Sequence, residues 1–262
     1  RVSPLFTIDG RILWVERIND VDSLVIRNVN RSNSITQLDP ITQGSVPSGT
    51  YINGFKLTPN SRYAIYTANH NSINRYDIYK VFLGNPGQGT RLSPTRLISD
   101  VNSVHLPFFI SPDSGTVVYS FATSTGYRTY YSTPIALDGN YAVLVTQTPT
   151  LGFSFPINLY DVISPDGTMV AFPVLTSSTC ELYVSSIRGR YAPYMITAGE
   201  SVTGCSITSF RWAKSHGGDY IIMHSKYNET YPMMYFVNVN TQSMVKISDN
   251  TLGHAYIKDY IL

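Results

Sequence analysis

The sequence is poor in charge and in helical patterning. Only 14% of its 262 residues are Asp, Glu, Lys or Arg, and the net charge is +2. So small a charge, with no stripe of Lys and Arg, argues against a nucleic-acid-binding surface. No apolar run approaches the length of a membrane-spanning helix. Apolar residues do not recur at the helical period anywhere, so we expect a chain built of strands.

Cysteine is also scarce. Cys180 and Cys205 are the only two, too few for the common four-ligand zinc site, and no His lies at metal-ligand spacing, so we predict no metal. The two cysteines could meet across neighbouring repeats, and both a disulfide and two free thiols fit the sequence. Few charges, 20 Tyr and many Ser, Thr and Asn are typical of secreted surfaces. We therefore expect an extracellular or periplasmic protein.

Signatures of common catalytic sites are missing. The chain has no G-x-S-x-G pentapeptide, which forms the nucleophile turn of α/β hydrolases. It has neither a glycine-rich phosphate loop nor a Ca²⁺ loop of alternating carboxylates. A glycosidase needs two carboxylates across a cleft, and Asp161 with Glu181 or Glu200 are candidates that no spacing selects. We predict no enzyme activity and no cofactor.

The sequence does contain a repeated unit, seen most fully at residues 163–172. An apolar run, a Ser/Thr-Pro-Asp/Asn-Gly turn and an alternating run of β-branched and aromatic residues indicate two strands joined by a tight turn. The residues at the third turn position lie 51, 53, 53 and 51 residues apart: Asp9, Asn60, Asp113, Asp166 and Gly217. Five copies at so even a period indicate a repeat architecture.

The turn residues have a structural explanation of their own. Proline fixes φ, an Asp or Asn side chain accepts hydrogen bonds within its own turn, and glycine adopts positive φ. We therefore interpret Asp113 and Asp166 as turn residues rather than as ligand-binding residues.

Each copy continues with two further strand-like runs, which gives four strands per unit. We predict an all-β fold, a β-propeller of five four-stranded blades of about 51–53 residues each, in one domain of residues 1–262. The predicted blades are residues 1–48, 49–102, 103–155, 156–204 and 205–253. Residues 254–262 are expected to join the first blade and close the ring, which removes an exposed edge. The alternative is a piece of a longer protein with more blades.

The fourth unit carries a recognisable set of motifs: Ser164-Pro165-Asp166-Gly167, Val170-Ala171-Phe172, Leu182-Tyr183-Val184 and Ile196-Thr197. It resembles the propeller repeat of the TolB family and its WD40-like relatives. The fifth unit departs from it, with Ser215-His216-Gly217-Gly218 in place of the turn. The resemblance implies the fold and not the function. Proteins with such blades include periplasmic interaction partners, the gating propellers of some peptidases and extracellular proteins.

Candidate binding residues follow from the predicted fold, because the first strands of the blades and the loops before them line the central channel and one face. Aromatic, Asn and His side chains in these segments suit a sugar or a peptide, although tyrosines also pack between blades. They are Tyr51, Asn53, His105, Phe153, Phe155, Asn158, Tyr160, His254 and Tyr256. Asp161 and Arg211 hold equivalent positions in adjacent units, and we expect them to form an ion pair between blades.

Two functions from different classes remain open. The first is a non-catalytic module that presents a face to a protein partner or to a neighbouring copy, and the low charge and missing catalytic signatures favour it. The second is a propeller that binds or hydrolyses a glycan at the channel mouth.

Overall fold

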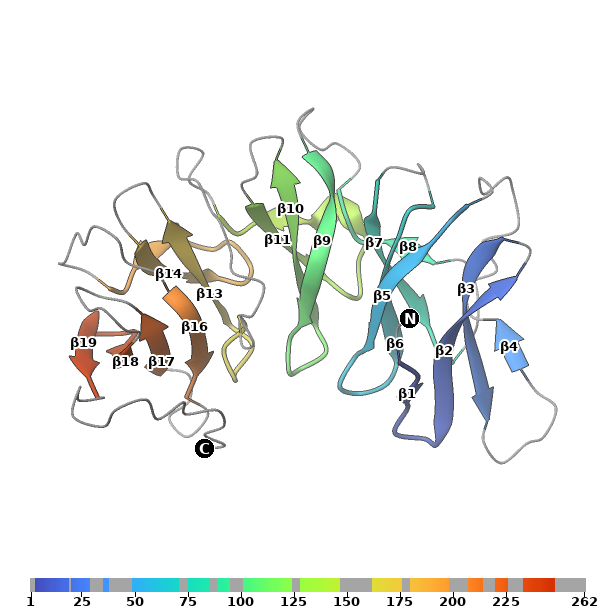
Figure 1. Ribbon diagram of the computed structural model, residues 1–262, viewed down its shortest axis with the longest axis horizontal. Coiled ribbons are helices and arrows are strands. Elements are labelled where there is room, and N and C mark those ends of the chain that lie inside the picture. The colour runs from blue at the N-terminus through green and yellow to red at the C-terminus, as the bar shows by residue number, and fades with distance from the viewer. Residues whose placement is uncertain are drawn as a thin grey trace. The chain divides into compact units, whose positions relative to one another are not determined.

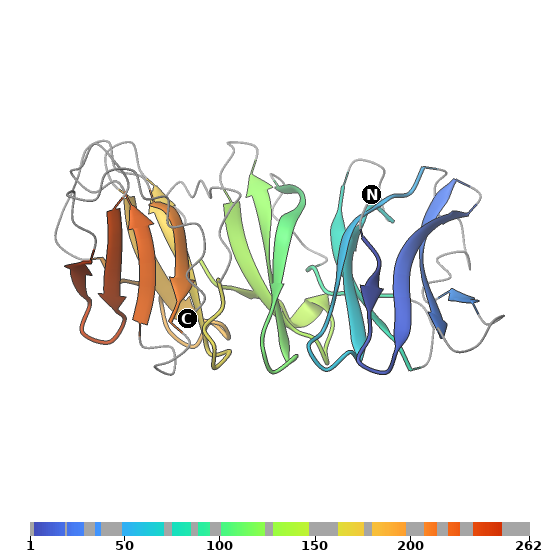
Figure 2. The same ribbon diagram turned by 60° about the horizontal axis from the view of Figure 1, so that its bottom comes forward.

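Repeated antiparallel sheets make up the described part of the chain. A computed structural model describes residues 3–18, 20–28, 35–37, 49–70, 75–84, 89–94, 101–123, 128–146, 162–175, 180–197, 207–213, 220–225 and 233–247. Among these residues the only helical segment is one 3₁₀ turn, η1 (Gly139–Tyr141). The strands form five separate sheets (Figures 1 and 2). The predicted all-β class is confirmed.

In four of the sheets, four consecutive strands pair in chain order. The first contains β1 (Leu5–Phe6), β2 (Arg11–Ile18), β3 (Val21–Asn28) and β4 (Ile35–Gln37). The second contains β5 (Ile52–Leu57), β6 (Tyr63–Ala68), β7 (Asp77–Phe82) and β8 (Thr90–Arg91). The third contains β9 (Val101–Ile110), β10 (Thr116–Thr123), β11 (Arg128–Pro134) and β12 (Val143–Leu144). The fifth contains β16 (Ile207–Trp212), β17 (Tyr220–Ser225), β18 (Met233–Asn238) and β19 (Ser243–Lys246).

The fourth sheet has three strands among the described residues: β13 (Met169–Leu175), β14 (Cys180–Ser186) and β15 (Tyr194–Met195). A single bridge between Ile163 and Val170 stands where the other sheets have their first strand. The four-stranded unit predicted from the repeat is therefore observed in the first, second, third and fifth sheets.

The chain divides into two compact units, and the boundary falls within the third sheet. The first unit is Arg1–Thr125 with Tyr131–Val143, and the second is Gly126–Tyr130 with Leu144–Leu262. The single domain predicted from the sequence stays a prediction.

The first unit has two buried cores, one on each face of the second sheet. Alternate side chains of β6 point to opposite faces, so Tyr66 enters one core and Ile65 the other. The first core joins side chains of the first two sheets, among them Leu13, Leu24, Ile26, Ala64, Tyr66 and Val81. The second core joins the second and third sheets, among them Ile65, Ile78, Phe108, Val117, Tyr119 and Phe121. The apolar side chains of the predicted strands thus fill the two cores.

The second unit contains the fourth and fifth sheets. Val170, Ala171 and Phe172 of β13 are fully buried in succession. The indole Nε1–H of Trp212, in the fifth sheet, donates to the carbonyl oxygen of Val162 at 3.2 Å. This buried bond satisfies the one polar group of the Trp212 ring and ties the fifth sheet to the segment before β13.

The turns of the first four sheets share one backbone conformation. The fourth turn position has positive φ in each: 77° at Gly10, 51° at Ser61, 61° at Ser114 and 73° at Gly167. Its N–H donates to the carbonyl oxygen of the first turn position, at 2.7–3.1 Å. The left-handed conformation that the motif predicts for glycine is therefore kept where serine replaces it.

Side chains at the first and third turn positions close each turn. The Ser111 hydroxyl donates to Asp113 Oδ1 at 2.5 Å, and the Gly115 N–H donates to the same oxygen at 2.9 Å. Asp166 Oδ1 likewise accepts from the Ser164 hydroxyl at 2.5 Å. The interpretation of Asp113 and Asp166 as turn residues is confirmed.

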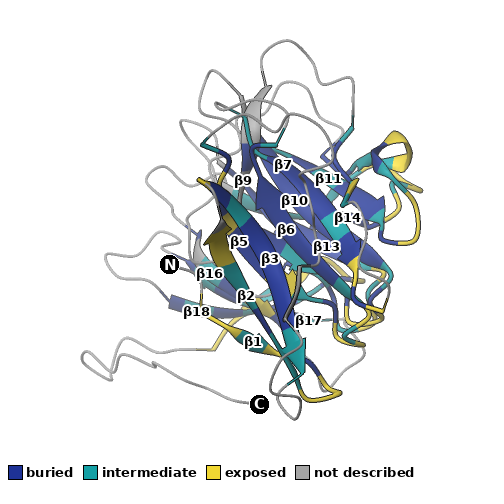
Figure 3. Ribbon diagram, turned by 90° about the vertical axis from the view of Figure 1, so that its right-hand side faces the viewer, coloured by how far each residue is buried: buried dark blue, intermediate teal, exposed yellow. Residues whose placement is uncertain are grey.

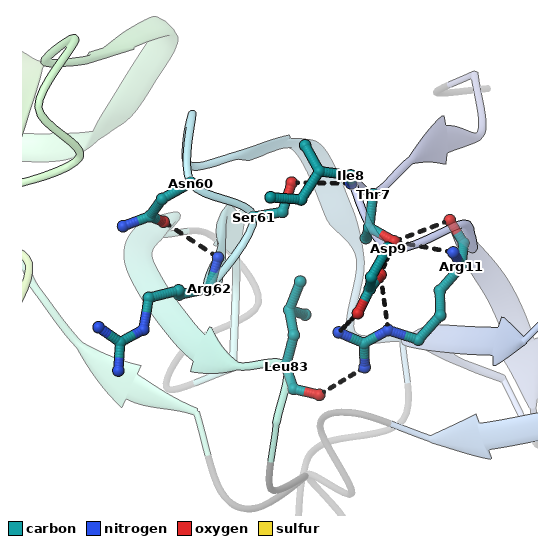
Figure 4. A network of polar contacts seen from close by, with 8 residues as sticks. All are labelled: Thr7, Ile8, Asp9, Arg11, Asn60, Ser61, Arg62 and Leu83. Carbon is teal, nitrogen blue, oxygen red and sulfur yellow. Dashed lines mark hydrogen bonds and ion pairs between the residues drawn. The ribbon is translucent and has the colours of Figure 1, made fainter.

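The first turn adds a contact to the second sheet (Figure 4). The Arg11 guanidinium pairs with Asp9 at 2.8 Å and donates to the carbonyl oxygen of Leu83, also at 2.8 Å. The hydrogen bonds from Arg11 lower the pKa of the Asp9 carboxyl. The Ile8 N–H donates to the Ser61 hydroxyl at 3.2 Å, so adjacent turns are joined directly.

Candidate interaction surface

Two of the predicted binding residues, Tyr51 and Asn53, lie together at the start of the second sheet. Both are exposed, and the exposed fraction of Tyr51 is 42%. Ile52 pairs with Ala68 and Gly54 with Thr67, so Asn53 has no partner in β6 and forms a β-bulge. Bulges redirect a side chain and disrupt the edge of a sheet. The bulge presents Asn53 to solvent beside Tyr51.

Bulges recur in the first strands of other sheets. In β9 the register shifts between the pairs Phe109–Val118 and His105–Ser120. In β16 it shifts between the pairs involving Ile207 and Ser209. The backbone of His105, a predicted binding residue, thus lies at the irregular part of a first strand. A bulge makes an edge strand a poorer template for pairing with a further strand.

The Tyr51 ring is covered on one side by a cation from the first sheet. The Arg17 guanidinium lies 4.7 Å from the ring centroid, within cation–π distance. It also lies 3.6 Å from Asp20 and 3.8 Å from Asp22. Interaction with Tyr51 raises the pKa of Arg17, so the guanidinium keeps its charge. Asp20 has a φ of 61°, which Asp tolerates in a tight hairpin, and its carboxylate is exposed.

Backbone hydrogen bonds fix the position of Tyr51. Its N–H donates to Asn69 Oδ1 at 2.6 Å, and the Asn69 N–H donates to the Tyr51 carbonyl oxygen at 3.3 Å. The Ile52 N–H donates to Asp22 Oδ2 at 3.1 Å. The Tyr51 surface, as we call it, consists of Arg17, Asp20, Asp22, Tyr51, Asn53 and Asn69. It is held from both the first and the second sheet.

His70 lies next to this surface in sequence, in an aromatic environment. Its ring centroid is 4.7 Å from that of Tyr79 and 5.8 Å from that of Tyr66. Burial lowers the pKa of His70 from 6.5 to about 4, so the ring is neutral at pH 7. Within the described part of the chain its buried Nε2 has no hydrogen-bond partner.

Comparison with known proteins gives structures and no sequence relatives. No protein-family model matches the chain, and no curated protein does. Prolyl oligopeptidase B of Galerina marginata, solved with a 25mer macrocyclization substrate, is 12% identical with a TM-score of 0.60. A structure from a study of two prolyl endopeptidases is 13% identical with a TM-score of 0.57. These matches cover 93% and 94% of this chain.

The fold is propeller-like. TolB of Acinetobacter baumannii is also similar, at 14% identity and a TM-score of 0.46 over 93% of this chain. The chain spans 37% of the oligopeptidase, 36% of the endopeptidase and 54% of TolB.

Most of the other predicted site residues lie outside the described residues. They are Phe153, Phe155, Asn158, Tyr160, Asp161, Glu200, Cys205, His254 and Tyr256. Arg211 lies in β16 and is exposed, and Cys180 is the first residue of β14. The Asp161–Arg211 ion pair and the Cys180–Cys205 disulfide therefore stay predictions.

The described residues were also compared with the requirements of a glycan-hydrolysing site, a metal site and a membrane span. Glu181, one of the carboxylates considered for glycan hydrolysis, accepts a hydrogen bond from the Tyr183 hydroxyl at 3.1 Å. Among the described residues, no three His, Cys, Asp or Glu side chains gather where they could hold a metal ion. The same residues include no helix long and apolar enough to cross a membrane.

Four members of the Tyr51 surface were missed by sequence reasoning: Arg17, Asp20, Asp22 and Asn69. Arg17, Asp20 and Asp22 belong to the first sheet and Asn69 to the end of the second strand of the second sheet, whereas the prediction considered only first strands. The hairpin between β2 and β3 could have indicated these residues, because it contacts the start of the second sheet.

Proposed function

We propose that this protein is a non-catalytic, extracellular or periplasmic β-propeller that binds another protein. The observation that carries the proposal is the Tyr51 surface, in which an exposed aromatic ring is stacked by a guanidinium at 4.7 Å. Tyr and Arg are enriched among the residues that dominate protein interfaces. Because hydrogen bonds hold the Tyr51 backbone and Arg17 packs on its ring, ordering this residue costs little on binding.

In the full proposal, the five sheets are the blades of one propeller. The even repeat of 51 to 53 residues, the shared turn conformation and the two matches to peptidase structures support it. The predicted closing strand, residues 254–262, lies outside the described residues and belongs to this proposal. The Tyr-rich, weakly charged composition supports an extracellular or periplasmic location.

The peptidase structures support the fold and carry over no activity. Identity to them is 12% and 13%, and the matched part is little more than a third of each chain. Folds of this kind host many unrelated functions, so function has to be argued from the site.

The alternative is a propeller that binds or hydrolyses a glycan. An exposed Tyr51 beside Asn53 suits a sugar ring and its hydroxyl groups. Because Arg17 already covers one face of the Tyr51 ring, a sugar would have to stack on the other face. This geometry favours a protein partner, which can accept the exposed Asp20 carboxylate as well as the ring.

The test uses Tyr51→Ala, with Tyr141→Ala as a control that removes a tyrosine from η1, elsewhere in the first unit, which is 57% exposed against 42% for Tyr51. Each variant is incubated with proteins from the surroundings in which the native protein occurs, and the proteins that it retains are quantified by mass spectrometry. The protein that the wild type retains most strongly is then purified and titrated against each variant. We expect the wild type and Tyr141→Ala to bind it alike, and Tyr51→Ala to bind at least about tenfold more weakly. Glycan-array binding that depends on Tyr51 would favour the alternative instead.

A further inference from the structure

The tip of the hairpin between β2 and β3 is fixed against the start of the second sheet. The Gly49 N–H donates to the Asp20 carbonyl oxygen at 3.4 Å, and the Asp22 N–H donates to the Thr50 carbonyl oxygen at 3.1 Å. The Ile52 N–H donates to Asp22 Oδ2, also at 3.1 Å. All of these residues belong to the first compact unit, so the place of the hairpin tip beside the second sheet is set within that unit.

The Asp20 side chain is 77% exposed, although its backbone is held. Arg17 Nε lies 3.6 Å from Asp20 Oδ1, which is longer than a charge-assisted hydrogen bond of about 2.7–2.9 Å. The same guanidinium is shared with Asp22, at 3.8 Å. Within the described part of the chain, no hydrogen bond reaches the Asp20 carboxylate. Two carboxylates thus share one guanidinium, which leaves these three residues a net charge of −1.

The backbone of Asp20 allows its carboxylate to be removed without disturbing the turn. Ile18 pairs with Val21, so the hairpin has a two-residue turn that ends at Asp20. Asp20 has a φ of 61°, in the left-handed region that glycine adopts most readily. Glycine is also the favoured residue at the end of such a turn. Asp20 therefore differs from the ordinary residue of this position by an exposed charge.

Tyr51 places an aromatic surface beside this charge. The Arg17 guanidinium lies 4.7 Å from the ring centroid, and 42% of Tyr51 is still exposed. In Figure 3, β5, which follows Tyr51, has exposed residues, whereas β3 and β6 are largely buried. An arginine side chain suits both features, because its methylene stem packs on apolar surface while its guanidinium binds a carboxylate through two N–H groups.

We propose that the Tyr51 surface binds an arginine side chain of the protein partner, with its guanidinium on Asp20 and its stem on the Tyr51 ring. The inference rests on the proposed function and adds the chemistry of the partner. One incoming cation balances the surplus negative charge, whereas an acidic side chain would add a third carboxylate to Asp20 and Asp22. Arg17 already makes both kinds of contact within the chain. Arginine suits the site better than lysine, since its planar group stacks on aromatic rings.

The experiment titrates a single arginine into the isotope-labelled full chain and follows backbone amide signals by NMR. The probe is acetyl-arginine-methylamide, and the control compound is acetyl-citrulline-methylamide, which has nearly the same shape and no charge. We expect the arginine compound to shift the amide signals of Asp20, Asp22 and Tyr51 until they saturate, and the citrulline compound to leave them unchanged. Added salt should weaken the binding, because the charges are exposed. Absent shifts, or equal shifts with both compounds, would overturn the proposal.

Two variants separate the Asp20 carboxylate from the overall charge. Asp20→Gly removes it at a φ that glycine adopts freely, and thermal unfolding checks that the variant is folded. Glu16→Gln is the control, because it removes the same charge from another exposed position of the first sheet. We expect Asp20→Gly to bind the arginine compound about three- to fivefold more weakly, the range of a well-oriented exposed ion pair, and Glu16→Gln to bind like the wild type. Unchanged binding by Asp20→Gly, or an equal loss in Glu16→Gln, would contradict the assignment.

A comparison with Tyr51→Ala separates the failure of this inference from the failure of the proposed function. The protein retained most strongly by the wild type is titrated against Tyr51→Ala and Asp20→Gly. Weaker binding in both variants supports the arginine contact. Weaker binding in Tyr51→Ala alone would overturn the arginine contact and leave the protein-binding function standing. Binding that neither variant changes would overturn the proposed function itself.

Discussion

The backbone N–H of Asn60 donates a hydrogen bond to the hydroxyl of Ser114, 3.0 Å away and 54 positions later in the chain. One repeat earlier, the Ile8 N–H donates to the Ser61 hydroxyl at 3.2 Å. In both cases the acceptor is the serine that replaces glycine in the turn motif. Serine at the fourth turn position therefore links its own turn to the turn of the preceding sheet.

Two substitutions separate the contribution of the Ser114 hydrogen bond to stability from the cost of its backbone conformation. Ser114 has a φ of 61°, which costs about 1–2 kcal/mol for a residue other than glycine. Ser114→Ala keeps that cost and loses the hydrogen bond, so we expect it to lower the free energy of unfolding by about 1 kcal/mol. Ser114→Gly loses both, and we expect a smaller change. Urea denaturation measures the difference, and an alanine variant as stable as the wild type would contradict it.

Gly139 is required for a different reason, close packing against the second sheet. A Cβ at this position would lie 2.0 Å from the Ser93 carbonyl oxygen and 2.6 Å from its carbon. The backbone has to move to admit it, so we expect Gly139→Ala to destabilise the protein by about 1–3 kcal/mol or more. Gly10→Ala is the control, because no atom lies within 4 Å of its added Cβ and only its φ of 77° is strained. Thermal unfolding should rank Gly139→Ala as the less stable variant.

Lys80 joins the second sheet to the third through two carbonyl groups. Its ammonium group donates to the carbonyl oxygens of Ile135 and Leu137, both at 2.6 Å. The ammonium group is partly buried, and this burial lowers the pKa of Lys80. Lys80→Met leaves both acceptors without this donor, and we expect a loss of about 1–3 kcal/mol in urea denaturation. Lys80→Arg should retain most of the stability, and equal losses in the two variants would show that the hydrogen bonds contribute little.

The repeat and its turns could be predicted from sequence because they depend on local chemistry. Asp113 and Asp166 close their own turns within two residues of the chain, so neighbouring letters suffice. The role of Ser114 could not be predicted, since its hydrogen-bond partner, the Asn60 N–H, lies in another repeat. Local patterns specify a turn but not what the turn contacts.

The candidate surface shows the same division. Tyr51 and Asn53 were found because they lie directly before and within a first strand, whose place in the fold follows from the repeat. Arg17 and Asp22 were missed because they come from the hairpin of the preceding sheet. The repeat period predicts that consecutive sheets are neighbours, but the register of their strands decides which side chains meet. That register includes the bulge at Asn53, which the repeat period does not predict.

His70 gives the protein a predictable response to acid. Burial lowers its pKa from 6.5 to about 4 in the folded state, whereas an unfolded chain keeps the ordinary value. Between these two values the unfolded state binds more protons, so the free energy of unfolding should fall as the pH falls, by at most about 1.4 kcal/mol per pH unit. The slope should fade above pH 6.5 and vanish more than about one pH unit above it. His70→Gln does not titrate, and urea denaturation across this range should give the variant a flatter pH dependence than the wild type. Loss of the ring contacts with Tyr66 and Tyr79 would shift its curve by a constant amount. Parallel curves for the two proteins would therefore show that His70 is not the titrating group.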